Sequence, residues 1–186
     1  MNYRLGVNVA ALLLVGFVGQ ASGNTDCPTG AVDGSLDPLS SPDENIECRF
    51  IARIYCHVEQ YRTMGLDEAN AVTRTAQNLS TVGRVGSHST NDFTPLVQVA
   101  ADAIYHKDKM PQWTAYYEAA FGCGVEKRIM DPELKKKVAP TWDAAAKACE
   151  KQYPGAGTGY PNESLRNCLE KSMDQVVGVA AKTSKK

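Results

Sequence analysis

Residues 47–61 read ECRFIARIYCHVEQY, a stretch with helical periodicity that carries two cysteines eight residues apart. Its apolar residues recur at the three- and four-residue steps that place side chains on one helix face; they are Ile51, Ile54, Val58 and Tyr61. Eight residues of helix rise about 12 Å, whereas the Cα atoms joined through a disulfide lie about 5.5 Å apart. Cys48 and Cys56 therefore cannot bond to each other on a continuous helix, and each is expected to tie a different neighbour to it.

The N-terminus has the layout of a cleaved secretory signal. Arg4 precedes an apolar run from Val7 to Val18, and small residues follow up to Gly23. The run is shorter than the about 20 residues that a transmembrane helix needs, and its flanks are those of a signal peptide. We therefore expect residues 1–23 to be removed on export to the periplasm or the extracellular space, leaving no membrane anchor. The alternative is a retained N-terminal anchor.

Export changes how the cysteines are interpreted. An even number in an oxidising compartment favours disulfide bonds; the six are Cys27, Cys48, Cys56, Cys123, Cys149 and Cys168. None belongs to a Cys-x-x-Cys pair, so neither thiol–disulfide exchange nor a zinc finger is indicated. The pairing that we expect is Cys56 with Cys123, Cys48 with Cys27, and Cys149 with Cys168.

The remainder of the chain predicts a single all-α domain. Residues 24–41 are rich in Pro, Gly, Asp and Ser and are expected to form an irregular lead-in held by Cys27. A first helix is expected from the Ser41 cap to Gly65, and further helices over 66–79, 94–106, 111–121, 131–138, 141–153 and 162–182. Because strand-type alternation is scarce, residues 42–186 are expected to form a compact bundle of about six or seven short helices, stapled by disulfides.

Composition and periodicity predict a loop followed by the third helix. Residues 80–92 have the composition of a loop, and Thr94 with Pro95 is expected to open the helix. Its inward-facing residues are then expected at helical spacing; they are Leu96, Val99 and Ala103, followed by either Tyr105 or His106.

Glycine and proline are expected to end two other helices. Gly122 and Gly124 are expected to close the helix that Pro111 opens, because glycine is unfavourable inside a helix. Pro140 is expected to interrupt the helix that starts near residue 131.

Candidate chemistry in the sequence is sparse. A net charge of −1 argues against general affinity for nucleic acid. Asp102 and His106, at i and i+4, could offer a carboxylate and an imidazole to one metal ion, although a surface ion pair explains the same spacing. Ser87 and His88 are adjacent in a loop-like stretch that lacks the Gly-x-Ser-x-Gly elbow of hydrolases. No catalytic residue and no cofactor is expected.

One aromatic cluster is a candidate binding surface. Trp113, Tyr117 and Phe121 share a helical stripe, with Tyr116 to one side. Core packing explains such a stripe. The alternative is that Trp113, Tyr116 and Tyr117 anchor a partner, since tyrosine and tryptophan dominate interface energetics.

One block of the chain resembles a known group of proteins. The helix CRFIARIYCHVEQY is followed by LVQVAADAIYHKDKMPQWTAYYEAAFGC. Tyr105 at a helix end, the proline that opens the next helix, and Phe121 shortly before Cys123 are similar to small periplasmic helical proteins of Gram-negative bacteria. That group includes immunity proteins that protect against type VI secretion toxins. It is usually shorter, and it shows Phe-Pro-Cys where this chain has Phe-Gly-Cys.

The resemblance implies an exported helical protein that acts by binding another protein. The partner would be a toxin or a cell-wall hydrolase whose active site is blocked. Two alternatives stay open: a small secreted hydrolase or metal-dependent enzyme that uses Asp102 and His106, and a carrier whose helices enclose an apolar ligand.

Overall fold

The computed structural model describes residues 27, 44–82, 89–154 and 161–184. Within them the chain forms six α-helices and no strand: α1 (Glu44–Thr63), α2 (Glu68–Val82), α3 (Thr90–Tyr105), α4 (Gln112–Arg128), α5 (Pro132–Gln152) and α6 (Glu163–Ser184). The predicted all-α bundle stapled by disulfides is confirmed. None of these six helices is both long and apolar enough to cross a membrane. The predicted signal peptide, the lead-in apart from Cys27, the Ser41 cap and the stretch around His88 lie outside the described residues.

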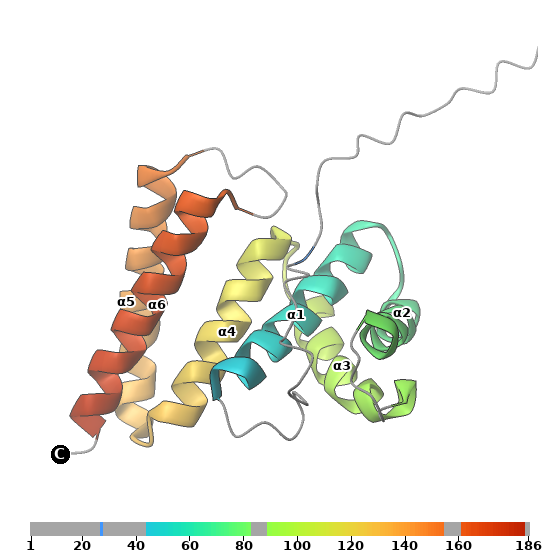
Figure 1. Cartoon of the computed structure of the whole chain (residues 1–186), viewed down its shortest axis with the longest axis horizontal. Coiled ribbons are helices and arrows are strands. Elements are labelled where there is room, and N and C mark those ends of the chain that lie inside the picture. Colours follow the sequence, from blue (N-terminus) through green and yellow to red (C-terminus); the bar gives the residue numbers. More distant parts are fainter. Residues whose placement is uncertain (1–26, 28–43, 83–88, 155–160, 185–186) are drawn as a thin grey trace, which may run out of the picture.

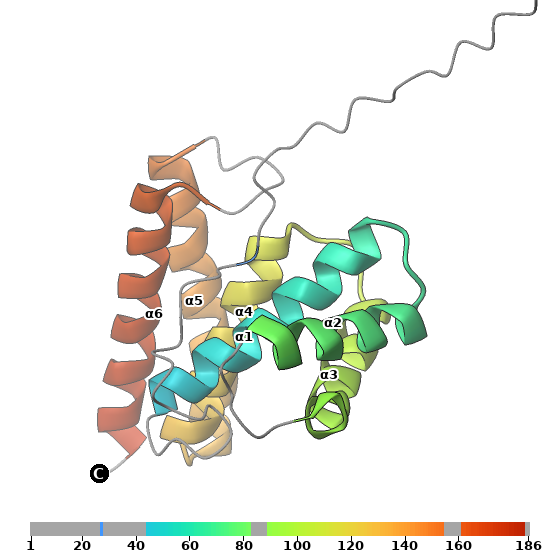
Figure 2. The same cartoon turned by 45° about the vertical axis from the view of Figure 1, so that its right-hand side comes forward.

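Helix α1 is central because it buries two faces (Figure 1). Phe50, Ile54 and Val58 pack with residues of α2 and α3 in one apolar cluster. Ala52 and Cys56 belong to a second cluster with α4, α5 and α6. Helix α1 therefore contacts α2, α3 and α4, while α6 packs on α4 and α5. Figure 2 shows α5 and α6 running side by side as a hairpin at one end of the molecule.

Three disulfides join Cys27 to Cys56, Cys48 to Cys123, and Cys149 to Cys168. The pairing of Cys149 with Cys168 is confirmed, and Cys48 and Cys56 are not bonded to each other, as predicted. The other two predicted pairings were wrong, because the partners are exchanged.

The exchange follows from the length and direction of α4. Cys123 lies inside this helix rather than beyond its end. Helix α4 runs antiparallel to α1, since its last turn carries Lys127 in an ion pair with Glu47, whereas the N–H of Met110, just before α4, donates to Glu59. Cys123 therefore meets the first turns of α1, where Cys48 lies.

The prediction that Gly122 and Gly124 end α4 was wrong, since the helix continues to Arg128. Each glycine costs about 1 kcal/mol relative to alanine inside a helix. Tertiary contacts on both sides offset that cost. The disulfide at Cys123 holds the segment on α1, and the Phe121 ring stacks on Trp142 of α5 with centroids 5.2 Å apart.

Helix α3 begins at Thr90, four residues before the predicted start at Thr94. Ser89 and Asp92 form a capping box, in which the N–H of Ser89 donates to Asp92 Oδ2 at 2.6 Å. The buried face then follows from the added turn: it comprises Phe93, Val97, Ala100, Ala101 and Ile104. The predicted inward face was therefore wrong for Leu96 and Val99, which are 38% and 63% exposed.

Helix α5 passes through Pro140 without a break, so the predicted interruption was also wrong. The Asp131 carboxylate caps the helix by accepting the N–H of Glu133 at 2.9 Å. Val138 and Trp142, on either side of the proline, are both buried. Their packing offsets the about 3 kcal/mol that a proline costs inside a helix.

Helix α6 starts with a side-chain cap that can be tested directly. Asn162 Oδ1 accepts the N–H of Leu165 at 2.9 Å. Because loss of such a cap costs about 1 kcal/mol, Asn162→Ala is expected to lower the free energy of unfolding in urea by about that amount. Asn167→Ala, an exposed position inside the same helix, is the matched control and should cause no loss. Equal stability of the two variants would show that the cap contributes nothing.

Candidate functional site

The three aromatic residues proposed as a binding surface lie in the core. Trp113, Tyr116 and Tyr117 are 7%, 6% and 2% exposed. The rings of Tyr116 and Tyr117 meet edge to face, with centroids 5.1 Å apart and planes at 81°. Their packing accounts for most of their surface. Both tyrosines, however, also line an open cleft.

The cleft lies between α1, α4 and α6 and has a volume of about 240 Å³. We call it the α1–α4–α6 cleft. Its lining residues are Cys48 and Arg49 from α1; Tyr116, Tyr117, Ala120, Gly124 and Arg128 from α4; and Glu170, Met173, Asp174 and Val177 from α6. Two of these residues, Tyr116 and Tyr117, were predicted from the sequence as binding candidates, and the others were not.

The charged rim of the cleft is available to a bound group. Arg49 and Asp174 are exposed, and Glu170 is half-buried. Within the described part of the chain, none of these three side chains forms a hydrogen bond or an ion pair with another residue. An arginine on α1 and two carboxylates on α6 thus line the same cleft, and no direct hydrogen bond or ion pair joins them.

Tyr116 gives the floor of the cleft a hydrogen-bonding group. Burial raises the pKa of the Tyr116 hydroxyl, an effect that Arg53 and Arg49 oppose. Glu170 raises the pKa further, and Arg166 lowers it. Because the net shift is upward, the hydroxyl is protonated at neutral pH and can donate as well as accept a hydrogen bond.

This environment predicts a late-titrating tyrosine. Absorbance at 295 nm during an alkaline titration should show a phenol that ionises above the usual range and disappears in Tyr116→Phe. A raised folded-state pKa contributes stability that is fully present below the unfolded-state pKa of about 10 and is lost as pH rises through the folded value. As the pH rises above about 10, the free energy of unfolding should therefore fall less for Tyr116→Phe than for the wild type. Identical titration curves for the two proteins would contradict the environment described here.

Asp102 and His106 lie on the exposed side of α3. The Gln98 amide donates to Asp102 Oδ1 at 2.8 Å and to Glu68 at 2.9 Å. The hydrogen bond from Gln98 is the largest effect that lowers the pKa of the Asp102 carboxyl, and the contact with Glu68 is the second largest. His106 Nδ1 lies 2.7 Å from the backbone oxygen of Asp102 rather than from its carboxylate. In the described ranges, no group of three or more His, Cys, Asp or Glu side chains could hold a metal ion.

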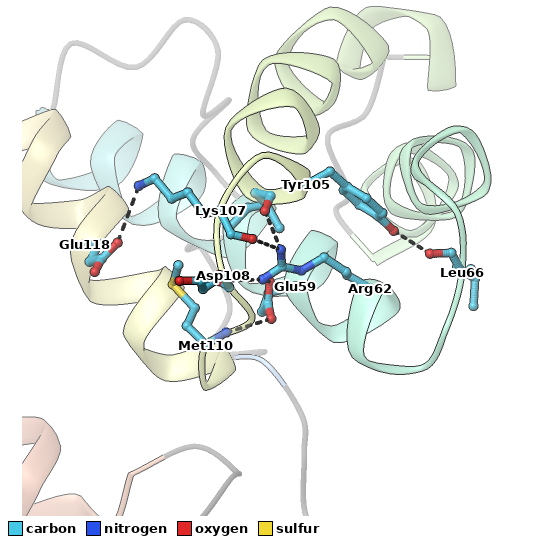
Figure 3. A network of polar contacts seen from close by, with 9 residues as sticks. Glu59, Arg62, Leu66, Tyr105, Lys107, Asp108, Met110 and Glu118 are labelled. Atoms are coloured by element: carbon cyan, nitrogen blue, oxygen red, sulfur yellow. Dashed lines mark hydrogen bonds and ion pairs between the residues drawn. The ribbon is translucent and has the colours of Figure 1, made fainter.

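A buried ion pair that was not predicted from the sequence joins α1 to the connection between α3 and α4 (Figure 3). Glu59 is fully buried and Arg62 is 6% exposed, and Arg62 Nη2 lies 2.7 Å from Glu59 Oε2. The guanidinium also donates to the carbonyls of Ile104, Lys107 and Asp108, at 2.5, 2.7 and 3.0 Å.

These contacts satisfy the backbone of the α3–α4 connection from within α1. Glu59 Oε1 accepts the N–H of Met110 at 3.2 Å. Nearby, the Tyr105 hydroxyl at the end of α3 donates to the carbonyl of Leu66, between α1 and α2, at 2.6 Å. Arg62 Nε is buried without a hydrogen-bond partner, but the contacts that the network makes all join parts of the chain, so its role is structural. The i, i+3 spacing of Glu59 and Arg62 was visible in the sequence, but their burial was not.

Comparison of the chain with protein-family models, with curated proteins and with solved structures finds no match. The function is therefore inferred from the residues of the chain itself.

Proposed function

We propose that this protein is an exported protein-binding module whose contact site is the α1–α4–α6 cleft. The lining of the cleft carries the proposal. Interfaces between proteins are enriched in aromatic residues, Met and Arg, and the residues whose loss costs most are Trp, Tyr and Arg. Side chains of these kinds converge on the cleft from three helices: Arg49, Tyr116, Tyr117, Arg128 and Met173.

The size and charge of the cleft favour a side chain of a partner over a whole small ligand. Its volume of about 240 Å³ is below the roughly 300–1,000 Å³ of typical small-molecule sites. Charges of both signs on its rim fit a partner loop with complementary charges, which provides specificity and speeds association. A carrier of an apolar ligand would instead need a mostly apolar cavity, whereas two arginines and two carboxylates line this cleft.

The partner that we propose is a toxin or a cell-wall hydrolase in the periplasm. The three disulfides are typical of a protein that folds in an oxidising compartment. The resemblance of the segment from Cys48 to Cys123 to periplasmic immunity proteins supports inhibition by binding. In this proposal the partner inserts a loop from the rim of its active site into the cleft, and the bound module blocks access to that site.

The proposal is tested by reversing one charge at the cleft and one elsewhere. Arg49→Glu changes an exposed cleft residue, and Arg74→Glu makes the same change at an exposed position on α2. An interface arginine can contribute about 2 kcal/mol, so Arg49→Glu should weaken partner binding by about thirtyfold or more. Affinity is measured for the protein that co-purifies with the tagged wild type, and Arg74→Glu should bind it as the wild type does. Equal affinities of the two variants would rule out the cleft as the contact site.

A further inference from the structure

Helix α3 has a second apolar face that the core does not use. Its first face is buried. Leu96, Val99 and Ala103 lie three and four residues apart and therefore form a separate stripe along the helix. Leu96 and Val99 are 38% and 63% exposed, and Ala103 is half-buried. A surface helix normally carries one apolar stripe, and a helix that is apolar on more sides is buried on more sides.

The second face of α3 leads into an apolar groove of about 410 Å³ between α1, α3 and α4. Ala103 and Ile104 form one wall, Ile51 and Tyr55 contribute from α1, and the opposite wall is α4. The groove is also lined by four charged residues: Lys107, Glu118, Glu126 and Lys127. A Cβ atom built at Gly122 in that wall would meet no atom within 4 Å. The surface thus combines a protruding ridge, Leu96 and Val99, with an adjacent hollow.

A ridge beside a groove of the same chemistry is self-complementary. A two-fold symmetric dimer requires one patch that fits its own copy, and here the ridge of each copy can enter the groove of the other. The two ends of the stripe also carry opposite charges. Asp92 lies in the first turn of α3, where its Oδ2 accepts the N–H of Ser89, and Lys107 lies two residues beyond the last residue of α3.

We propose that the protein forms a homodimer through this face, with the two α3 helices antiparallel. The antiparallel direction places Asp92 of each copy beside Lys107 of the other, whereas a parallel direction would bring like charges together. Among the residues that the structure describes, the Lys107 ammonium contacts Glu118 alone, at 3.7 Å between exposed side chains, so its charge is available across the interface. Complementary charges of this kind fix the register of an interface.

Dimerisation leaves the α1–α4–α6 cleft of each copy open. Helix α4 presents Tyr116, Tyr117 and Ala120 to the cleft, but Ala119 and Gly122 to the groove. Residues at these two sets of positions lie on different sides of a helix. The dimer therefore displays two clefts, and it stands independently of the function proposed for them.

Sedimentation equilibrium of the oxidised protein tests the dimer with a matched pair of substitutions. Val99→Asp places a charge in the proposed interface, and Val179→Asp places one on α6 at the same exposure, 63% against 62%. The wild type and Val179→Asp should be dimers. The dissociation constant of the Val99→Asp dimer should be at least about tenfold higher than that of either. A wild type that is monomeric at about 100 μM, a hundred times a micromolar dissociation constant, would overturn the proposal. So would equal behaviour of the two variants.

A second pair of variants tests the groove without adding charge. Gly122→Leu fills it, and Gly178→Leu on α6 is the control, because a Cβ at Gly178 also meets no atom within 4 Å. Circular dichroism should show both variants folded, with dimerisation lost only in Gly122→Leu; a dimer that persists in it would exclude the groove.

Lys107→Glu should weaken the dimer, and an unchanged dimer would contradict the antiparallel direction.

Discussion

Arg62→Ala is expected to lower the free energy of unfolding by about 3–5 kcal/mol, the cost of removing one partner of a buried ion pair. The substitution leaves the Glu59 carboxylate, which is fully buried, without its cation. It also leaves the carbonyls of Ile104, Lys107 and Asp108 without the donor that α1 supplies. Urea unfolding followed by circular dichroism measures the loss.

Arg62→Lys is the informative comparison for this site. Lysine keeps the positive charge beside Glu59 but lacks the planar fork that reaches several acceptors at once. We expect its cost to lie between that of the wild type and that of Arg62→Ala. If Arg62→Ala were instead within about 1 kcal/mol of the wild type, the median for exposed ion pairs, the pair would not hold the α3–α4 connection as described.

Removing the disulfide between Cys48 and Cys123 is the second large effect that we expect. These residues are 75 apart in sequence, and closing a loop of that length stabilises a protein by about 4.5 kcal/mol in the chain-entropy model. The double variant Cys48→Ala/Cys123→Ala should lose about that much. The bond also joins α1 to α4. Both helices contribute residues to both apolar clusters, so its loss should loosen the packing of both.

The hairpin disulfide provides the control. Cys149 and Cys168 are 19 residues apart, and a loop of that length corresponds to about 3 kcal/mol. Alanine pairs avoid free thiols in both variants, so unfolding in urea compares the two bonds directly. A larger loss for the Cys149/Cys168 variant than for the Cys48/Cys123 variant would contradict the proposed importance of the α1–α4 contact.

The parts of the fold that depend on local pattern were predictable. The i, i+3, i+4 spacing in α1 and the absence of strand patterns were sufficient for an all-α bundle, and helical rise alone excluded a bond between Cys48 and Cys56. The pairing of those cysteines was not predictable in this way. It depends on how far α4 extends past Gly122, and tertiary contacts of Phe121 and Cys123 decide that length.

Helix α3 shows a different limit. Ser89 and Asp92 have the spacing of a capping box, but the loop-like composition around them concealed it. Periodicity could not choose the buried face either, because α3 carries two apolar stripes. Only the positions of α1 and α2 determine that Phe93 and Val97 point inward while Val99 does not.

The candidate site was predictable only in its aromatic part. Tyr116 and Tyr117 stood out as members of an aromatic cluster, and both line the cleft. Arg49, Met173 and Glu170 come from two other helices, and no spacing in the sequence brings them together. Convergence of such residues is a property of the tertiary structure, so the charged rim of the cleft had no signature in the sequence.

Native mass spectrometry of the oxidised protein, isolated from its source organism by an affinity tag, tests the central claim most directly. A module that acts by binding another protein should appear as a stoichiometric complex with a second polypeptide. The complex should be absent from the Arg49→Glu sample and present with Arg74→Glu. A protein that carries only a metal ion or a small molecule, or a complex that survives Arg49→Glu unchanged, would contradict a protein-binding function at the α1–α4–α6 cleft.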